Sequence, residues 1–201
     1  MSGAEPTIRT SATSTQVPEA AVMPERAAKA PEPGTQIPSH YRWCYGCGSD
    51  HPSGLHMKLF AGPGLTTEGR FLVTDMHQGS PGLAHGGLLT TAMDEVLGSL
   101  NWLLATPAVT AHLECDFRRP VPVGSELAMR AQVDGAVGRR IFMSAVALID
   151  DRPAVSARAV FVQVPIEHFT AHGNPEHVEQ AIRDRASGGP AFGSTGLQVN
   201  P

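Results

Sequence analysis

The chain has 201 residues, of which 41% are hydrophobic and 17% charged, so it is long enough for one ordinary domain and is not a fully disordered chain. Its formal net charge of −4 argues against a general nucleic-acid binder, because the phosphate backbone attracts a cationic surface. It has no apolar run long enough for a membrane span, no secretion signal and only three cysteines, so we expect a soluble cytoplasmic protein without a disulfide framework.

The composition divides the chain into three parts. Residues 1–40 are rich in Ala, Pro, Ser, Thr and Glu without periodicity, which predicts a disordered extension. Residues 41–169 carry the apolar patterns of a folded domain. In the tail, 170–201, Asn174 is followed by a proline and an acidic residue, which predicts the cap and first turn of a short helix ending near Ala186.

The folded part begins with two expected strands, at 55–60 and 66–73, and a turn-rich stretch follows them. Residues 85–105 then carry the only long helical pattern, with apolar side chains recurring on one face at Leu88, Ala92, Val96, Leu100 and Leu103. Four β-type runs come after it, at 108–118, 125–137, 139–150 and 153–164. Without a second crossover helix these strands should be antiparallel, which predicts an α+β fold with one curled sheet of about six strands around a single long helix.

The other face of the predicted helix carries Gly87, Thr91, Asp94 and Gly98. Glycine inside a helix costs about 1 kcal/mol relative to alanine. Glycines on this face therefore suggest that a ligand or a second subunit approaches the backbone closely.

The segment 78–95, QGSPGLAHGGLLTTAMDE, joins a glycine- and proline-rich loop to the helix start. It closely resembles the loop-and-helix signature of PaaI-like hotdog-fold acyl-CoA thioesterases, a family that includes thioesterase superfamily members 4 and 5. The resemblance extends from Cys44-x-x-Cys47-Gly48, through Gly54-Leu55, to the last predicted strand.

The resemblance implies a hotdog-fold enzyme that hydrolyses an acyl-CoA to the free acid and CoA without a metal or redox cofactor. It also implies a homodimer or homotetramer with each active site between two subunits. Carried over by position, Asp94 is the general base or nucleophile, the backbone amide of Gly86 polarises the thioester carbonyl, and Thr110 positions the water. Some relatives use an amide side chain in the preceding loop, for which Gln78 is the nearest candidate.

The chemistry of these residue types agrees with that assignment. Thioester hydrolysis needs hydrogen-bond donors for the developing oxyanion and a carboxylate that attacks or deprotonates water. Free N–H groups at a helix N-terminus supply such donors. Gly86 and Gly87 allow the acyl group to come close, and His85 shapes the helix start.

Two arginine pairs could hold the phosphates of CoA. They stand at the expected strand ends beside turns, at Arg118-Arg119 and Arg139-Arg140. Solvated turn arginines would give the same pattern. No phosphate-binding loop or dinucleotide motif occurs, which argues against nucleotide hydrolysis and hydride transfer.

Several residues have simpler interpretations. Asp94 could be a solvated helix carboxylate, and Glu95 beside it is a rival catalytic acid. Thr110 could be an ordinary strand residue, and His85 a capping histidine.

The pair Cys44 and Cys47 has His40, His51 and His56 nearby, which leaves a zinc site open although the second pair of a zinc finger is missing. The segment 48–56 resembles the Asp/His dyad of hotdog enoyl-CoA hydratases, but its spacing differs. A non-catalytic acyl- or CoA-binding hotdog module is the remaining alternative.

Overall fold

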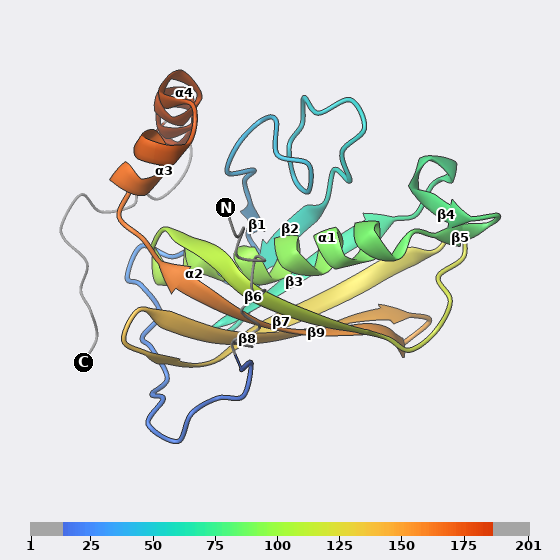
Figure 1. The fold of residues 1–201 in the computed structure, drawn as a ribbon, viewed down its shortest axis with the longest axis horizontal. Coiled ribbons are helices and arrows are strands. Elements are labelled where there is room, and N and C mark those ends of the chain that lie inside the picture. The colour runs from blue at the N-terminus through green and yellow to red at the C-terminus, as the bar shows by residue number, and fades with distance from the viewer. Residues whose placement is uncertain (1–13, 187–201) are drawn as a thin grey trace, which may run out of the picture.

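The computed structural model describes residues 14–186, with side chains to residue 183. Its main feature is one antiparallel sheet in which seven strands follow the order β1-β2-β3-β7-β8-β9-β6 (Figure 1). The strands are β1 (Gln36–Ile37), β2 (Lys58–Ala61), β3 (Thr66–Leu72), β6 (Ala108–Phe117), β7 (Glu126–Val137), β8 (Arg140–Ile149) and β9 (Arg152–Gln163). The four runs predicted after the helix are therefore confirmed, and the sheet has one strand more than expected, the short β1.

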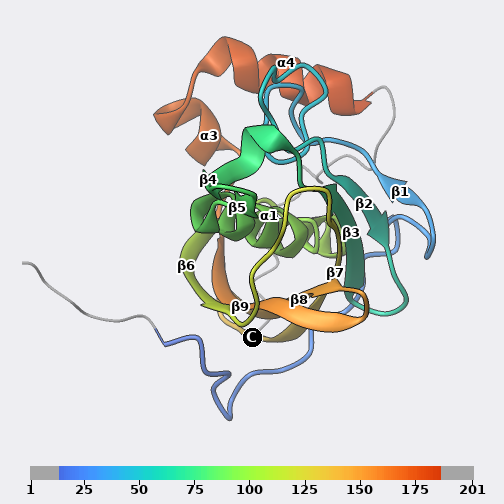
Figure 2. The ribbon, with the colours of Figure 1, turned by 90° about the vertical axis from the view of Figure 1, so that its right-hand side faces the viewer.

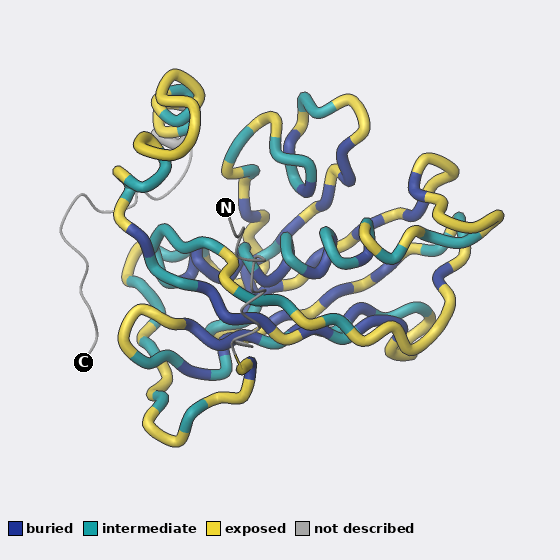
Figure 3. Tube along the Cα trace, in the orientation of Figure 1, coloured by how far each residue is buried: buried dark blue, intermediate teal, exposed yellow. Residues whose placement is uncertain are grey.

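The sheet curls around the helix α1 (Gly86–Gly98), which lies in its concave face (Figure 2). Alternate residues of β7 point to the helix and are buried, as the alternation in the sequence predicts. On α1 the buried side is centred on Met93, Val96 and Leu97, and Val96 is 0% exposed. Figure 3 shows this buried stripe along the helix and the sheet beneath it. The predicted arrangement of one curled sheet around a central helix is confirmed.

The predicted helix 85–105 is divided into two pieces, α1 and the single turn α2 (Asn101–Leu104). The carbonyl of Val96 accepts hydrogen bonds from Thr67 Oγ1 (3.1 Å) and Ser99 Oγ (2.6 Å). The Leu100 N–H therefore bonds to the carbonyl of Leu97 instead (3.1 Å). Side-chain donors that compete for helix carbonyls in this way end a regular helix.

The N-terminal prediction differs from the structure over residues 14–40. Val22 and Ala136 exchange two backbone hydrogen bonds (2.9 and 2.8 Å), and Ala27 N–H donates to Leu103 O (2.8 Å). Ile37 in β1 is buried against β2. Backbone pairing and one anchoring side chain thus order a segment whose composition alone predicts disorder, while residues 1–13 lie outside the described part.

Between β1 and β2, residues 38–57 form a long loop of turns and bends that contains neither helix nor strand. The expected strand 55–60 begins only at Lys58, because His56 has a φ of 49°, a left-handed conformation that interrupts an extended chain. Backbone hydrogen bonds join Leu55 N–H to Tyr45 O (2.8 Å) and Met57 N–H to Gly46 O (2.9 Å). Figure 1 shows this loop above the outer side of α1.

The C-terminal helix is confirmed as α4 (Pro175–Ala186), and a short helix α3 (Glu167–His172) precedes it. The Asn174 side chain accepts from the N–H groups of Glu176 (3.0 Å) and His177 (3.3 Å), as a capping residue does. None of the helices within 14–186 has the length and apolar character needed to cross a bilayer.

Candidate active site

The start of α1 is shaped by a small hairpin, β4 (Gln78–Ser80) and β5 (Leu83–Ala84), which follows a 3₁₀ turn η1 (Asp75–His77). His85 N–H donates to His77 O (2.7 Å), which fixes the entry of the chain into the helix. The His85 ring then caps the helix, because its Nδ1 accepts from Gly87 N–H (2.9 Å). His85 therefore lies at the helix start, as expected, and its Nδ1 is engaged by the backbone.

The backbone N–H groups at the start of α1 differ in whether they already have a hydrogen-bond acceptor. Gly87 N–H is taken by the His85 ring, and the N–H groups of Leu88 and Leu89 bond to the His85 carbonyl (3.0 and 3.1 Å). Within residues 14–186, no acceptor takes the N–H of Gly86. Gly86 thus presents a free donor at the positive end of the helix, where an anionic oxygen is favoured.

An open cleft of about 440 Å³ lies over this helix start. It is lined by Tyr45, Gln78, His85, Gly87, Leu88 and Thr91. The structure therefore brings three of the predicted residues together here: Gln78, His85 and Gly87. Both ends of the Gln78 amide already have loop partners, since Nε2 donates to Asp75 O (3.1 Å) and Oε1 accepts from Gly82 N–H (2.6 Å).

Tyr45 is the cleft residue that the sequence reasoning missed. It belongs to the loop 38–57 and comes next to Cys44, forty positions before the cap of α1. Its ring packs edge-on against His51, with a centroid distance of 4.9 Å. Only its place between two cysteines marks it in the sequence, and that pattern gives no hint of a contact with the helix start.

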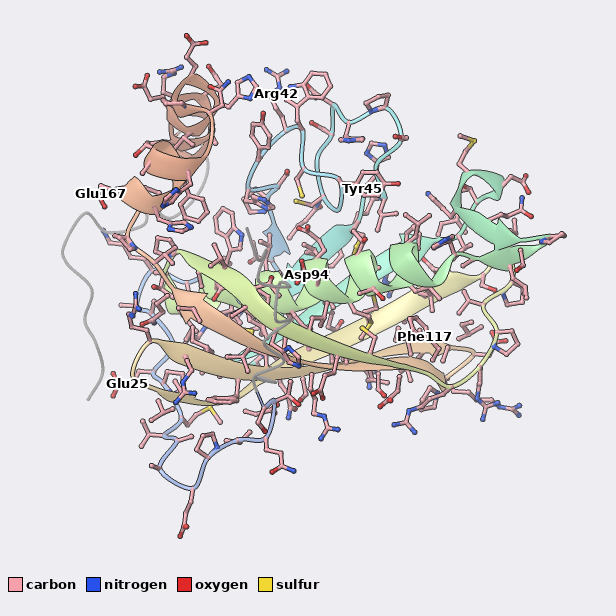
Figure 4. All side chains as sticks on the ribbon, in the orientation of Figure 1. Glu25, Arg42, Tyr45, Asp94, Phe117 and Glu167 are labelled. Carbon is pink, nitrogen blue, oxygen red and sulfur yellow. The ribbon has the colours of Figure 1, made fainter. Side chains whose placement is uncertain are left out.

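Asp94 and Thr110 are in direct contact. Thr110 Oγ1 donates to Asp94 Oδ1 at 2.8 Å. Figure 4 labels Asp94 on α1. Thr110 reaches the helix side of β6 because the register shifts between Thr110 and His112, where β6 pairs with β9. Such a bulge reverses the alternation of side chains, so Thr110 shares the face of Leu113 and Cys115, which pack against the core.

The pKa of the Asp94 carboxyl is raised above its usual range, chiefly because burial penalises the charged form. The hydrogen bond from Thr110 opposes this effect by stabilising the carboxylate, and the nearby Cys44 adds to the increase. A carboxylate whose pKa is raised is a stronger base than an ordinary aspartate.

Asp94 cannot act on a thioester whose carbonyl is bound by Gly86 N–H of the same chain. The two residues are eight positions apart, and a helix rises 1.5 Å per residue, so they are separated by about 12 Å along α1. A thioester carbonyl must lie within about 3 Å of both the donor and the attacking group. The two halves of the predicted site are thus both present, but in different places on one protomer.

The arginine pairs lie at opposite ends of the sheet. Arg118 and Arg119 follow the end of β6, and Arg118 Nε donates to Ser156 Oγ (2.9 Å). Arg140 pairs with Val162 of β9, which in turn pairs with Val109 at the start of β6. The structure therefore does not bring the two pairs together in one protomer.

Glu95, the rival carboxylate, points away from the cleft and into the loop 38–57. Its Oε2 accepts from Cys44 Sγ (3.2 Å), and its Oε1 lies 3.8 Å from His40 Nδ1. Burial raises the pKa of Glu95 to about 7. Its surroundings are therefore those of a second site, separate from the Asp94–Thr110 pair.

The four ligand atoms of His40, Cys44, Cys47 and Glu95 lie within 4.8 Å of one another, so this group could hold a metal ion. The contact between the two sulfur atoms lowers the pKa of Cys44 and raises the pKa of Cys47.

Of the other two histidines considered for such a site, neither joins the cluster: His51 packs on Tyr45, and His56 Nδ1 lies 2.9 Å from Gly48 O. Asp50 of the hydratase-like segment is paired with Arg42 (Nε to Oδ2, 2.6 Å) in the exposed part of the loop.

Comparisons with known proteins agree with this fold. Residues 81–157 match the family model of the thioesterase superfamily. The Bos taurus acyl-coenzyme A thioesterase THEM4 is 37% identical over 92 residues, which cover 45% of this chain but only 38% of that protein.

Two solved structures share the fold: a thioesterase superfamily protein (TM-score 0.58, 24% identity, 66% of this chain and 69% of that chain) and the E. coli PaaI protein (TM-score 0.53, 18% identity, 55% of this chain and 81% of that chain). The resemblance to PaaI-like hotdog proteins that the sequence shows is thereby confirmed.

Proposed function

Because residues 81–157 match the family model of the thioesterase superfamily, we propose that this chain hydrolyses acyl-CoA thioesters to the free acid and CoA. The observation that carries this proposal is the contact between Thr110 Oγ1 and the half-buried carboxylate of Asp94. The THEM4 relative, named an acyl-coenzyme A thioesterase, supports the same chemistry.

In the proposed reaction the thioester oxygen accepts a hydrogen bond from Gly86 N–H at the start of α1. Asp94 takes a proton from a water held by Thr110, and that water attacks the carbonyl carbon; in the other version Asp94 attacks directly and water later cleaves the anhydride. The carbon–sulfur bond breaks, the acid leaves with the hydroxyl of water, and the proton passes to the CoA thiolate. The positive helix end stabilises the oxyanion.

The site is proposed to lie between two copies of the chain, so that Asp94 and Thr110 of one protomer face Gly86 of its partner. The separation of about 12 Å along α1, eight residues at about 1.5 Å each, supports this arrangement, because one thioester carbonyl cannot reach both groups of the same chain. The surface offered to that copy is exposed: β6 is an edge strand of the sheet, and Phe117 at its end is 53% exposed. An edge strand presents backbone N–H and C=O groups to which another chain can pair.

Within this proposal the phosphates of CoA are assigned to Arg118 and Arg119. These residues follow Phe117, and the Phe117 ring lies 3.6 Å from the position of a Cβ built on Gly86. The pair therefore stands at the oxyanion end of the site. Arg139 and Arg140 stand at the opposite end of the sheet and are assigned only a secondary role.

The direct test measures thiol release from a panel of acyl-CoA chain lengths by the wild-type chain and by Asp94→Asn. We expect the variant to lose about 10²- to 10⁴-fold in kcat while it still binds a non-hydrolysable acyl-CoA analogue. Full hydrolysis by the variant would exclude Asp94 as the base. Saturable binding without thiol release by the wild type would favour a non-catalytic acyl-binding module, and hydration of an enoyl-CoA would favour a hydratase.

A mixing experiment tests the shared site. Asp94→Asn and Gly86→Pro chains are each expected to be inactive, but a mixed dimer contains one intact site. After random exchange of subunits, activity should return to about a quarter of the wild-type value, because about half of the dimers are mixed and each has one of two sites. A chain that carries both substitutions, mixed with Asp94→Asn, is the matched control and should restore nothing. Failure of the first mixture to recover activity despite exchange would exclude the arrangement.

A further inference from the structure

We propose that His40, Cys44, Cys47 and Glu95 form a structural zinc site that fastens the loop 38–57 to α1. Three of the ligands come from the loop and the fourth comes from the helix. The proposal stands apart from the thioesterase reaction, since none of these four residues belongs to the Asp94–Thr110 pair or to the cleft.

The geometry of the cluster fits a tetrahedral ion. Bonds of about 2.0–2.3 Å from zinc to nitrogen, oxygen and sulfur place neighbouring ligand atoms about 3.3–3.8 Å apart in a tetrahedron. Cys47 Sγ lies 3.4 Å from His40 Nδ1, Cys44 Sγ lies 3.2 Å from Glu95 Oε2, and His40 Nδ1 lies 3.8 Å from Glu95 Oε1. These three distances are close to that range, and all four ligand atoms lie within 4.8 Å of one another, so small side-chain movements would bring them to the corners of a tetrahedron.

The donor set selects zinc among the common ions. Two thiolates and an imidazole suit a borderline-soft ion, whereas magnesium and calcium prefer sites made of oxygen alone. Four protein ligands close the coordination sphere and leave no position for substrate, which is typical of structural and not catalytic zinc. Ser39 Oγ lies 3.3 Å from Cys47 Sγ and can support this ligand as an outer hydrogen-bond partner.

Glycines let the loop wrap this closely around the glutamate. A Cβ at Gly46, between the two cysteines, would overlap the Glu95 carboxylate. A Cβ at Gly48 would lie 2.5 Å from the carbonyl oxygens of Arg42 and Cys44. The backbone also turns tightly here, with Gly48 N–H donating to Cys44 O (2.8 Å). A tight turn with glycine after the second cysteine holds both thiols toward one point.

The loop 38–57 is also a segment that a bound metal ion would stabilise. Residues 38–57 contain no helix or strand, and a loop of this length without secondary structure is uncommon in a compact domain. The ligands from the loop and Glu95 are far apart in the chain, 51 positions in the case of Cys44. An ion that binds these ligands only when the chain is folded adds its binding free energy to the stability of the fold.

The site has a consequence for the cleft. Tyr45, which follows the ligand Cys44 directly, lines the cleft over the start of α1. Figure 4 shows Tyr45 in the loop above the helix that carries Asp94. A zinc ion would therefore hold one wall of the cleft in place without contacting the substrate.

The test measures metal in the full-length chain, purified without a polyhistidine tag and dialysed against metal-free buffer. Elemental analysis is expected to find about one zinc per chain in the wild type. Cys44→Ser and Glu95→Gln should each retain less than about a tenth of that amount. Cys115→Ser is the matched control, because Cys115 lies on β6 outside the cluster, and it should keep its zinc.

Cobalt(II) substitution gives a second readout that does not depend on the stability of the variants. The cobalt-loaded wild type should show thiolate-to-cobalt charge transfer and the intense visible bands of a tetrahedral site. Circular dichroism establishes that each compared chain is folded. A folded wild type that binds neither zinc nor cobalt would overturn the proposal, whether its cysteines are free or joined in a disulfide. Full zinc retention by folded Cys44→Ser would overturn it as well.

Discussion

Replacing Gly86 by proline removes one hydrogen-bond donor and leaves the fold almost untouched. Gly86 is the first residue of α1, a position where proline is favoured because its N–H has no helical partner. The preceding residue must be extended, and His85 already has φ −71° and ψ 130°. The substitution therefore costs no hydrogen bond within residues 14–186. Lower freedom of the unfolded chain should stabilise the protein by about 0.4–1 kcal/mol.

The effect on catalysis should be far larger than the effect on stability. Loss of one backbone donor to a developing oxyanion costs about 2.7–4 kcal/mol of transition-state stabilisation, which is about 10²- to 10³-fold in kcat. The Leu88 and Leu89 amides cannot substitute, because both are bonded to the carbonyl of His85 (3.0 and 3.1 Å). Gly87 N–H is likewise held by the His85 ring.

The assay follows thiol release together with thermal unfolding. Gly86→Ala is the control, since it keeps the N–H and its Cβ would meet the Phe117 ring at 3.6 Å, an ordinary contact. Any loss of activity in Gly86→Ala measures crowding by a side chain. The further loss of activity in Gly86→Pro measures the contribution of the Gly86 N–H donor. Equal activity of the two variants, both folded at the assay temperature, would refute the assignment of Gly86 N–H as the oxyanion donor.

Thr110→Ala should lower kcat/KM about tenfold. A hydrogen bond to a charged group contributes about 1.5–3 kcal/mol, and the lower end applies because Thr110 is exposed in the single chain. Thr110→Ser should restore the rate, and an unchanged kcat/KM in Thr110→Ala would contradict the role of Thr110. The acid limb of the pH–rate profile should lie above the ordinary aspartate range near pH 4, because the pKa of Asp94 is raised, and it should move to higher pH in Thr110→Ala. The raised pKa of Asp94 also makes the stability of the fold depend on pH: the contribution of Asp94 is fully present below its unfolded pKa and is lost as pH rises through the folded pKa. At neutral pH the melting temperature of Asp94→Asn should therefore equal or exceed that of the wild type. A lower melting temperature of the variant would show that the carboxylate stabilises the fold.

The zinc proposal adds a prediction for Gly46. Gly46→Ala should displace the Glu95 carboxylate and lower zinc retention, because its Cβ would occupy the space of that group. Gly64→Ala is a useful comparison, since a Cβ there meets nothing within 4 Å although its φ of 57° also disfavours a side chain. Zinc loss in both variants alike would indicate general destabilisation instead of a local effect.

The local pattern of the sequence determined the elements and one half of the site. The apolar spacing of residues 85–105 identified the central helix, because side-chain periodicity follows directly from the backbone geometry. Turn residues further along the sequence marked the ends of the four later strands. The same periodicity placed Asp94 on the less buried side of the helix. These features depend on residues only a few positions apart.

Tertiary contacts decided the rest. The bulge beyond Thr110 turns its side chain toward Asp94, and no local signal marks a bulge whose register is set by pairing with β9. Side chains from β3 and the helix end compete for the Val96 carbonyl and so end α1 early. Glu95 joins Cys44 across 51 positions. Contacts of this kind depend on where distant segments meet in the folded chain, which residue spacing alone does not encode.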